Sequence, residues 1–504
     1  MEIAVITHLI GRRGLLVLAL GLAAFLAGPL SAVAQKLPPY SGSAGMLKIG
    51  KDPERPDAEI FHVAYTLKGA NPATRPVTFV FNGGPGAASI YLHLSAIGPK
   101  TIVTAGDGSF PAVPARLEDN PDSWIGFTDL VFIDPVGTGY SRMLPGPDGK
   151  PGDPKPYYTT DGDVDAIAGF MRQWLTVNKR WASPKAIAGE SYGGRRIAAL
   201  SRVLAERYGI NLNRAVLISP EFNMPSLPEP FPIYDLVHAM TLLPTQAAIA
   251  AHHGMSTIRN DAAGYKAAED FAMTEYLTGL ARLGRMNTQE QAAFYAKVGA
   301  LIGLDPALVA LNRGRIGEAV FGNNLLAAQG KTLDLYDGTQ ASDNPAPEKR
   351  DVWDVPPRTI NVFTGVLLPP FMDYVQKDLG YATERPYIVF NWEEAVLFDR
   401  KSSQGTPEDL AVALTQNTDL KVMVLNGYQD LGANYMLARY LLEQSIRSPS
   451  ARERLYFGTY PGGHMFYLRT KSRAEFTNDV RGFFAAQPSD STAALGTGGV
   501  SPRP

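Results

Sequence analysis

The chain has 504 residues, of which 49 are glycine, 39 are proline and none is cysteine. The lack of cysteine excludes disulfides, thiolate metal sites, iron–sulfur clusters and a cysteine nucleophile. A net charge of −2, from 47 basic and 49 acidic residues whose signs are interspersed, gives no reason to expect nucleic acid as a partner. With a hydrophobic fraction of 45%, the chain can bury a sizeable core, either as two or three domains or as one large domain with an insertion.

Residues 1–34 are predicted to be a secretory signal peptide. Arg12 and Arg13 precede an apolar run over residues 15–27, and residues 32–34 read Ala-Val-Ala. We expect cleavage after this segment and a secreted or periplasmic protein, exported by the general or the twin-arginine route. The alternative is a membrane anchor, but the apolar run is shorter than the ~18–20 residues that span a bilayer. No other stretch is long and apolar enough, so no stable membrane insertion is expected after cleavage.

Short apolar runs predict the strands of the fold. They cover residues 77–81, 130–133, 186–188, 215–218, 422–425 and 455–457. Such runs, ended by glycine, proline or polar residues and separated by helical segments such as residues 195–206, are typical of strands buried on both faces. The sequence therefore predicts an α/β fold with a mostly parallel sheet flanked by helices.

The pattern changes between residues 224 and 384. A proline-rich stretch at residues 225–232 is followed by alanine-rich helical segments, which cover residues 245–253, 261–283 and 289–302. We expect a helical insertion or cap, with a separate inserted domain as the alternative. It divides the α/β domain into a first part, residues 35–223, and a second part, residues 385–486. The tail, residues 487–504, is rich in Ser, Gly, Pro and Thr and is predicted to be disordered.

The sequence Gly-Glu-Ser-Tyr-Gly at residues 189–193 follows one predicted strand and precedes a predicted helix. This G-x-S-x-G pattern is typical of the α/β-hydrolase fold, in which the serine lies on a sharp turn that exposes its Oγ. Ser191 is therefore a candidate nucleophile. The alternative is that Ser191 only caps the helix that follows it.

A second glycine-rich loop, Asn-Gly-Gly-Pro-Gly at residues 82–86, follows the strand predicted at residues 77–81. Its glycines let backbone N–H groups approach a substrate closely. In an α/β-hydrolase this loop supplies one oxyanion-hole donor, and the residue after the nucleophile supplies the other. The predicted donors are the amides of Gly84 and Tyr192.

A serine nucleophile of this fold needs an acid and then a histidine later in the chain. His464 is the one histidine that follows the last predicted strands, and Asp430 directly follows the strand predicted at residues 422–425. Asp134 and Asp399 are the competing acids, although Asp134 precedes the serine and breaks the order. The sequence therefore predicts a triad of Ser191, Asp430 and His464.

Four blocks of sequence together resemble the serine carboxypeptidase family, peptidase family S10. These blocks are residues 81–86 with 97–99, residues 120–124 with 132–141, residues 189–194, and Asp430 with residues 463–465. The resemblance implies an α/β-hydrolase fold and a serine exopeptidase that hydrolyses C-terminal peptide bonds through an acyl-enzyme. It makes Ser191 the nucleophile, His464 the general base and acid, and Asp430 the residue that orients the imidazole.

The same resemblance implies a site for the free carboxylate of a peptide substrate. Its residues are Asn82, Gly83 and Glu190, and a protonated Glu190 can donate a hydrogen bond to that carboxylate. Two positions depart from the family pattern. Ala87 stands where a cysteine is usual, and Ala96 stands where a second acidic residue usually pairs with the glutamate.

The sequence is also compatible with other functions. An esterase or acyltransferase of the same fold is one alternative, since Ala96 removes a carboxyl of the peptide site. An aminopeptidase is another, although those enzymes usually carry His where Asn82 stands. A binding protein without catalytic activity is the third. His252 and His253 are expected to be a packed or solvated pair, so neither a metal nor an organic cofactor is predicted.

Overall fold

The computed structural model describes residues 36–222, 235–344, 358–485 and 501–502, except positions 51, 53, 112 and 147. The predicted signal peptide, residues 1–34, lies outside the described residues, as does all of the predicted disordered tail except Ser501–Pro502. The elements below belong to the unit that begins at Pro38. Among the described residues, no helix has the length and apolar character needed to cross a membrane.

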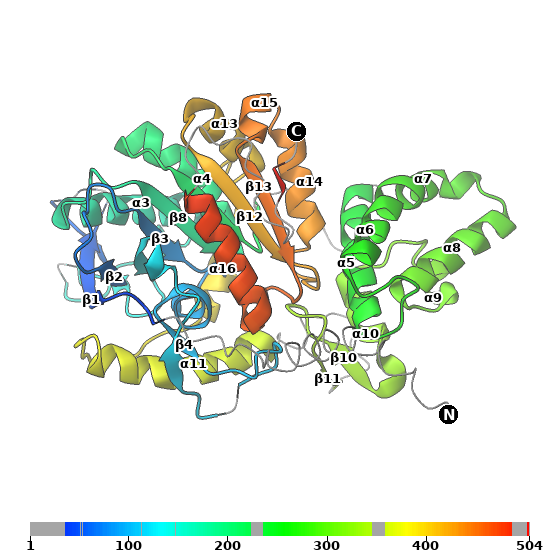
Figure 1. Ribbon diagram of the computed structural model, residues 1–504, viewed down its shortest axis with the longest axis horizontal. Helices are drawn as coiled ribbons and strands as arrows, with labels where there is room; N and C mark the ends of the chain where they lie inside the picture. Colours follow the sequence, from blue (N-terminus) through cyan, green and yellow to red (C-terminus); the bar gives the residue numbers. More distant parts are fainter. Residues whose placement is uncertain are drawn as a thin grey trace, which may run out of the picture. The chain divides into compact units, whose positions relative to one another are not determined.

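A mixed sheet lies at the centre of this unit (Figure 1). Its strands, in spatial order, are β1 (Tyr40–Ile49), β2 (Ala58–Leu67), β6 (Asp129–Ile133), β3 (Val77–Phe81), β8 (Lys185–Glu190), β9 (Arg214–Ile218), β12 (Lys421–Gly427), β13 (Leu455–Tyr460) and β14 (Ser501–Pro502), and β7 (Arg142–Met143) pairs with β2. From β6 to β13 all neighbours are parallel, whereas β1, β2, β7 and β14 pair antiparallel. Two small antiparallel pairs are separate: β4 (Lys100–Ile102) with β5 (Leu117–Asp119), and β10 (Lys331–Leu333) with β11 (Ala341–Asp343).

The predicted α/β fold with a mostly parallel centre is confirmed, because each of the six predicted strands lies within one of the six parallel strands. The prediction at residues 77–81 coincides with β3, whose five residues are all buried. Strands β1 and β2 are not among the predicted strands, and they pair over their whole length from Tyr40 opposite Leu67 to Ile49 opposite Ala58. Most of β1 lies at least partly exposed at the edge of the sheet and begins Tyr-Ser-Gly-Ser-Ala-Gly, so it lacks the continuous apolar run of a central strand.

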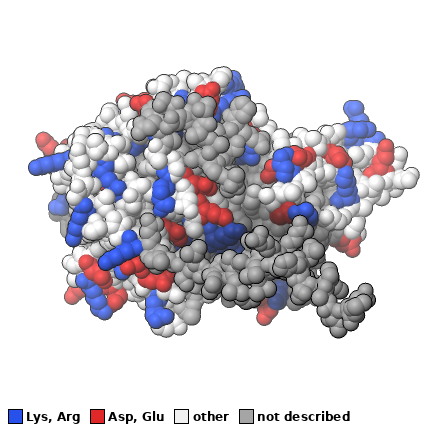
Figure 2. All heavy atoms as spheres, in the orientation of Figure 1, with Lys and Arg blue, Asp and Glu red and all other residues white. Residues whose placement is uncertain are grey.

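Helices cover the sheet on its flanks. They are α3 (Thr160–Val177), α4 (Tyr192–Tyr208), α13 (Pro407–Gln416), α14 (Tyr435–Ser445) and α16 (Thr470–Ala485), with the short α15 (Pro449–Arg452) near the end of α14. Figure 1 shows α16 crossing in front of β12 and β13. Helices α3, α4, α13 and α14 share one hydrophobic core with the strands, in which Trp174 packs edge-on against Phe79. On the face seen in Figure 2, basic and acidic side chains are interspersed, as the overall composition indicates.

Between β9 and β12 the described chain is mainly helical. The helices are α5 (Leu236–His252), α6 (Ala262–Phe271), α7 (Leu277–Arg282), α8 (Thr288–Ile302), α9 (Pro306–Leu311), α10 (Glu318–Asn324), α11 (Arg358–Lys377) and α12 (Trp392–Leu397). Helices α5 to α10 build a second core of their own, to which Leu431 of the loop after β12 contributes. In contrast, α11 lies against the sheet, where Tyr65 donates to Tyr374 at 3.0 Å. That residues 224–384 act as a cap stays a prediction.

Candidate active site

The predicted site residues follow neighbouring parallel strands. Glu190 is the last residue of β8, Asp430 lies three residues after β12 ends at Gly427, and His464 lies four residues after β13 ends at Tyr460. The carboxyl ends of parallel strands meet at one edge of a sheet, which is where ligands bind in open α/β folds. Strands β8, β9, β12 and β13 are consecutive in the sheet, so their loops share that edge.

Ser191 lies on a sharp turn between β8 and α4. Its φ of 59° and ψ of −124° are unusual for a residue with a side chain, and its backbone is held in place on both sides. Its N–H donates to the carbonyl of Ile218 at 3.0 Å, and its own carbonyl accepts from the amides of Gly194 at 2.7 Å and Glu221 at 2.9 Å. Although Ser191 occupies the N-cap position of α4, its side chain makes no capping hydrogen bond. The Oγ is therefore not used in capping the helix.

His464 and Asp430 form a buried pair. The imidazole Nδ1 lies 2.7 Å from Asp430 Oδ2, and the side chains are 4% and 0% exposed. The other carboxylate oxygen, Oδ1, accepts from the amides of Gly432 and Ala433, both at 2.9 Å. Burial alone lowers the pKa of His464, but the charge and hydrogen bond of Asp430 outweigh it and raise that pKa above its ordinary value. Backbone amides thus hold one oxygen of the carboxylate while the other contacts the imidazole ring.

The glycine loop after β3 lies in backbone contact with the serine turn. A Cβ added to Gly83 would fall 2.5 Å from both the carbonyl oxygen of Glu190 and the amide nitrogen of Tyr192. Gly84 has a φ of +101°, which favours glycine, and Tyr192 is the first residue of α4, where a backbone N–H has no acceptor within the helix. The two loops predicted to form the oxyanion hole are therefore neighbours.

Glu190 is a buried carboxyl with two donors. Asn82 Nδ2 donates to its Oε2, and the Tyr467 hydroxyl donates to its Oε1 at 2.7 Å. The amide of Leu92 donates to Asn82 Oδ1 at 3.1 Å, which fixes the orientation of the Asn82 side chain. Burial raises the pKa of Glu190 to about 7, although His464, Tyr467 and Asn82 each act to lower it.

The competing acids lie elsewhere in the structure. Asp134 follows β6, and its Oδ1 accepts from the amide of Ser89 at 2.8 Å, while burial raises its pKa to about 7. The Asp399 side chain is exposed and accepts from the amide of Lys401 at 2.8 Å. Of the three acids considered, Asp430 is therefore the one hydrogen-bonded to His464.

The expected histidine pair has no sign of a metal site. The rings of His252 and His253 lie nearly perpendicular, with centroids 5.0 Å apart. His253 Nε2 is hydrogen-bonded to the backbone carbonyl of Gly338 at 2.8 Å. No cluster of three or more potential metal ligands occurs within the described parts of the chain.

Three residues that surround the site are not among the predicted site residues. Tyr467 contacts Glu190, the Ser219 hydroxyl donates to the His464 carbonyl at 2.8 Å, and Tyr336 contacts His464 in two ways. The Tyr336 carbonyl accepts from the His464 amide at 2.5 Å, and the two ring centroids are 4.8 Å apart. Tyr467 has only its place three residues after His464 as a signal, and Tyr336 has none.

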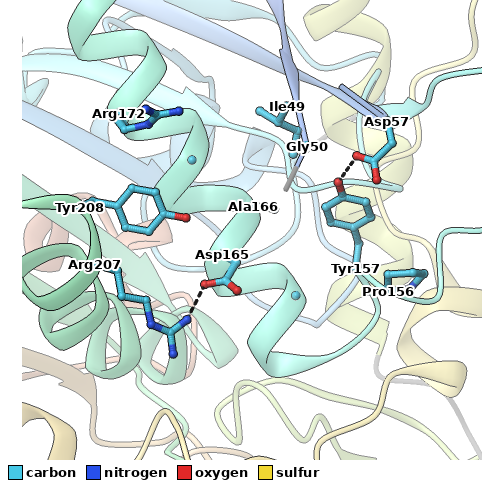
Figure 3. Close-up of a pocket in the computed structure, with 12 residues that line it drawn as sticks. Ile49, Gly50, Asp57, Pro156, Tyr157, Asp165, Ala166, Arg172, Arg207 and Tyr208 are labelled. Atoms are coloured by element: carbon cyan, nitrogen blue, oxygen red, sulfur yellow. Dashed lines mark hydrogen bonds and ion pairs between the residues drawn. The ribbon is translucent and has the colours of Figure 1, made fainter. Parts of the chain in front are cut away.

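A pocket of about 410 Å³ lies apart from these residues, between the end of β1 and helices α3 and α4 (Figure 3). Arg207 pairs with Asp165 at 3.0 Å, and the hydroxyl of Tyr157 donates to Asp57, as the dashed lines in Figure 3 show. None of the predicted site residues lines this pocket. Because Arg207 and Asp165 already pair with each other and none of the predicted site residues is present, it is a weaker candidate for chemistry than the loops around Ser191.

Comparison with known sequences relates part of the chain to one family. The profile described as serine carboxypeptidase matches residues 34–225. This part of the chain is similar to the serine carboxypeptidase family. The match to the family covers Asn82, Glu190 and Ser191 and ends before Asp430 and His464. The resemblance that the sequence motifs indicated is thereby confirmed.

Individual family members match parts of the chain. Pheromone-processing carboxypeptidase KEX1 of Yarrowia lipolytica is 34% identical over 142 residues, which are 27% of this chain and 20% of the relative. Serine carboxypeptidase-like 16 of Arabidopsis thaliana is 28% identical over 233 residues, 44% of this chain and 46% of the relative. The matched stretches thus span less than half the length of these curated relatives.

One family member of known structure shares the fold. A prohormone-processing carboxypeptidase of Saccharomyces cerevisiae superposes with a TM-score of 0.55 at 17% identity, over 88% of this chain and 90% of the other. At this identity the likeness concerns the fold alone. It agrees with the mixed sheet and flanking helices, so the predicted α/β-hydrolase fold is confirmed.

Proposed function

We propose that the chain is an exported serine carboxypeptidase that removes residues from the C-terminus of peptides through an acyl-enzyme. The match of residues 34–225 to the serine carboxypeptidase family supports this proposal. The observation that carries it is that Glu190, a buried carboxyl hydrogen-bonded to Asn82, directly precedes Ser191 on its sharp turn. A group suited to a terminal carboxylate thus lies beside a group suited to attack a peptide carbonyl.

In the proposed reaction the Ser191 hydroxyl attacks the scissile carbonyl while His464 accepts its proton. Asp430 holds Nδ1 of the imidazole, which leaves Nε2 to receive the proton and pass it to the leaving amine. The amides of Gly84 and Tyr192 stabilise the charge that develops on the carbonyl oxygen. Water then enters, His464 removes its proton, and the acyl-enzyme is hydrolysed.

The proposed substrate site selects the end of the peptide. Asn82, Gly83 and a protonated Glu190 hold the terminal carboxylate, to which an ionised Glu190 could not donate. Glu190 and Ser191 are adjacent in sequence, so the terminal carboxylate is held close to the attacked carbonyl. This spacing favours release of a single residue over cleavage in the middle of a chain.

The test compares an N-blocked dipeptide with its C-terminally amidated twin. Because a hydrogen bond to a charged group contributes about 1.5–3 kcal/mol, we expect kcat/KM to be roughly tenfold to a hundredfold higher for the free acid. The Ser191→Ala variant, assayed in parallel, must lose both activities. Equal rates on the two substrates from the wild type would contradict the carboxypeptidase proposal.

Esterase or acyltransferase activity is the second candidate, and Ala96 is the observation that favours it. The fully buried Ala96 places a methyl group where the family usually has the acidic partner of Glu190. An enzyme of this kind would hydrolyse esters of N-blocked amino acids and fail to cleave the corresponding free-acid dipeptides. The same pair of assays, extended by an ester, separates the two candidates.

Export is proposed from the N-terminal segment alone. If residues 1–34 are removed as predicted, the mature protein begins at Gln35. Expression with the full N-terminal segment, followed by N-terminal sequencing of protein from the periplasm or medium, tests this. A protein retained in the cytoplasm with Met1 intact would contradict it.

A further inference from the structure

Tyr467 is a buried tyrosine whose hydroxyl group contacts the candidate carboxylate site and not the triad. It lies in the short 3-10 helix Phe466–Leu468, and its hydroxyl donates to Glu190 Oε1 at 2.7 Å. Tyr467 is 0% exposed and Glu190 is 2% exposed, so water does not compete for this hydrogen bond. A buried hydrogen bond to a carboxyl fixes both the position and the proton affinity of that carboxyl.

The other neighbours of Glu190 cannot do the same. Asn82 contacts Oε2 through Nδ2, and its Oδ1 is already engaged by the amide of Leu92, so this side chain can only donate. Asp430 and His464 act on Glu190 through their charges. Tyr91 of α2 (Ile90–Leu92) is near enough to interact electrostatically with Glu190, but its hydroxyl bonds to Thr364 at 3.2 Å.

A tyrosine hydroxyl can both donate and accept, which suits it to a carboxyl that changes protonation state. When Glu190 is ionised, Tyr467 donates to Oε1. When Glu190 is protonated on the other oxygen, its O–H can donate to the terminal carboxylate of a substrate while Tyr467 stays hydrogen-bonded to Oε1. The two states differ by one proton that Glu190 takes from or gives to solvent, and the O–H bond of Tyr467 stays intact in both.

We propose that Tyr467 is a positioning residue of the carboxylate site, and that the Glu190–Tyr467 pair replaces the two-carboxyl pair that Ala96 makes impossible. The inference rests on the proposed function. Tyr467 holds Oε1 while Asn82 holds Oε2, so the carboxyl plane of Glu190 is fixed by one donor on each oxygen. The enzyme therefore keeps a preorganised group for the terminal carboxylate of a peptide despite the alanine.

If Tyr467 takes the place of the second carboxyl, it must affect the pKa of Glu190, which a merely structural contact would not do. A second carboxyl shares a proton with the first and favours its protonated form, whereas a tyrosine donor favours the ionised form. Tyr467 thus acts against burial, which by itself raises the pKa of Glu190. Removing the hydroxyl is expected to raise that pKa further, because the ionised form loses a donor.

The experiment measures kcat/KM against pH for an N-blocked dipeptide acid and an N-blocked amino acid ester. In the wild type we expect activity on the acid substrate to fall as the pH rises through the raised pKa of Glu190, about 7, and activity on the ester not to fall there. In Tyr467→Phe the alkaline limit for the acid substrate is expected to move upward by about one to two pH units, with the ester profile unchanged. In Glu190→Gln, which cannot ionise, adding Tyr467→Phe is expected to produce no such shift.

Tyr460→Phe is the matched control. The Tyr460 hydroxyl donates to Asp479 Oδ2 at the same distance of 2.7 Å, and Tyr460 is 2% exposed, but its partner is not in the candidate site. This variant is expected to leave both pH profiles in place. An unshifted acid-substrate profile in Tyr467→Phe, or an equal shift for acid and ester, would overturn the proposal.

The inference and the proposed function can fail separately. If the wild type cleaves no free-acid peptide, the proposed function is wrong, and the pair is tested by calorimetric binding of N-acetylphenylalanine across pH. If the alkaline limit of binding moves upward in Tyr467→Phe and not in Tyr460→Phe, the proposed role of the Glu190–Tyr467 pair is supported. A binding profile that is unchanged, or no binding by the wild type at any pH, overturns it.

Discussion

At the scale of single residues, the site combines backbone strain with buried charge. Ser191 and Ser219 both have positive φ values, 59° and 43°, and they follow the neighbouring strands β8 and β9. Conformations of this kind persist only where the surroundings hold them, and here each serine donates its backbone N–H to the carbonyl of an adjacent strand residue. The strain and the buried carboxyls Glu190 and Asp430 occur at the same edge of the sheet.

The role proposed for Asp430 gives the first prediction. Asp430→Asn keeps the side-chain shape but removes the charge that raises the pKa of His464 and fixes its tautomer. We expect kcat to fall by about 10⁴-fold, the size of the effect in well-studied serine triads, with little change in KM. Asp399→Asn, at the exposed competing acid, is the control and is expected to retain full activity. Equal losses in the two variants would contradict the assignment.

Glu394 gives a prediction on stability. This residue of α12 is 1% exposed, its Oε2 has no hydrogen-bond partner among the described residues, and burial raises its pKa to about 8 from an ordinary 4.5. The folded state therefore holds the proton that the unfolded state releases, and stability falls as pH rises from 4.5 toward 8. Glu394→Gln is expected to raise the free energy of unfolding by about 3–5 kcal/mol at pH 9 and to change it little at pH 4.

Denaturant unfolding at the two pH values measures this effect. Glu393→Gln, at the exposed neighbouring position on the same helix, controls for loss of a negative charge and is expected to change little at either pH. A stabilisation by Glu394→Gln of the same size at pH 4 and pH 9 would show that ionisation is not its cause.

At the scale of elements, the features that can be predicted from the sequence are those with a recognisable local pattern of residues. The central strands are continuous apolar runs, so they could be predicted. Ser191, Asp430 and His464 follow such strands, so they could be picked out as candidate site residues. The edge strand β1 could not be predicted, because its partly exposed residues have no such pattern. Tyr336 could not either, because its contact with His464 joins positions more than a hundred residues apart, and nothing local to Tyr336 encodes it.

The contact between the glycine loop and the serine turn gives an element-scale prediction. A Cβ at Gly83 would meet backbone atoms of Glu190 and Tyr192 at 2.5 Å, and no flexible side chain can move aside. We expect Gly83→Ala to lower kcat/KM by about 10²-fold, because the two loops must separate and the geometry of attack is lost.

Gly169→Ala is the control substitution for Gly83→Ala. Gly169 lies inside α3, and a Cβ there would meet nothing within 4 Å. Gly169→Ala is expected to stabilise the protein by about 0.5–1 kcal/mol and to leave kinetics unchanged. Steady-state kinetics and thermal unfolding of both variants check the pair. Full activity in Gly83→Ala would show that the loops are not in the tight contact described.

At the scale of the whole molecule, a chain without cysteine must hold its loops by packing and hydrogen bonds. The segment at residues 335–338, between β10 and β11, provides several such contacts to the loops that carry Asp430 and His464. Gly338 donates to the Gln429 carbonyl at 2.9 Å, Gly432 donates to the Leu335 carbonyl at 3.2 Å, and Arg469 lies 3.6 Å from Asp337. Folding of the region between β9 and β12 is therefore linked to the placement of the site.

Substitutions of Tyr336 test whether the region between β9 and β12 helps to place the site. The Tyr336 ring packs against the His464 imidazole, so Tyr336→Ala leaves a cavity beside the proposed base and is expected to lower kcat by about tenfold or more. Tyr336→Phe keeps the ring and the carbonyl and is expected to retain activity. The ratio of kcat values for these two variants, on a substrate without a free carboxylate, measures the effect. Equal kcat values would contradict a positioning role for the ring.

The central claim is that this chain trims peptides from the C-terminus with Ser191 as nucleophile. Digestion of one unblocked peptide of defined sequence, followed over time by mass spectrometry, tests it most directly. The account predicts a ladder of products that lose one residue at a time from the C-terminus with the N-terminus intact. No ladder is expected with Ser191→Ala or with the C-terminally amidated peptide. Shortening from the N-terminus, internal cleavage, or an equal ladder from the amidated peptide would contradict the account.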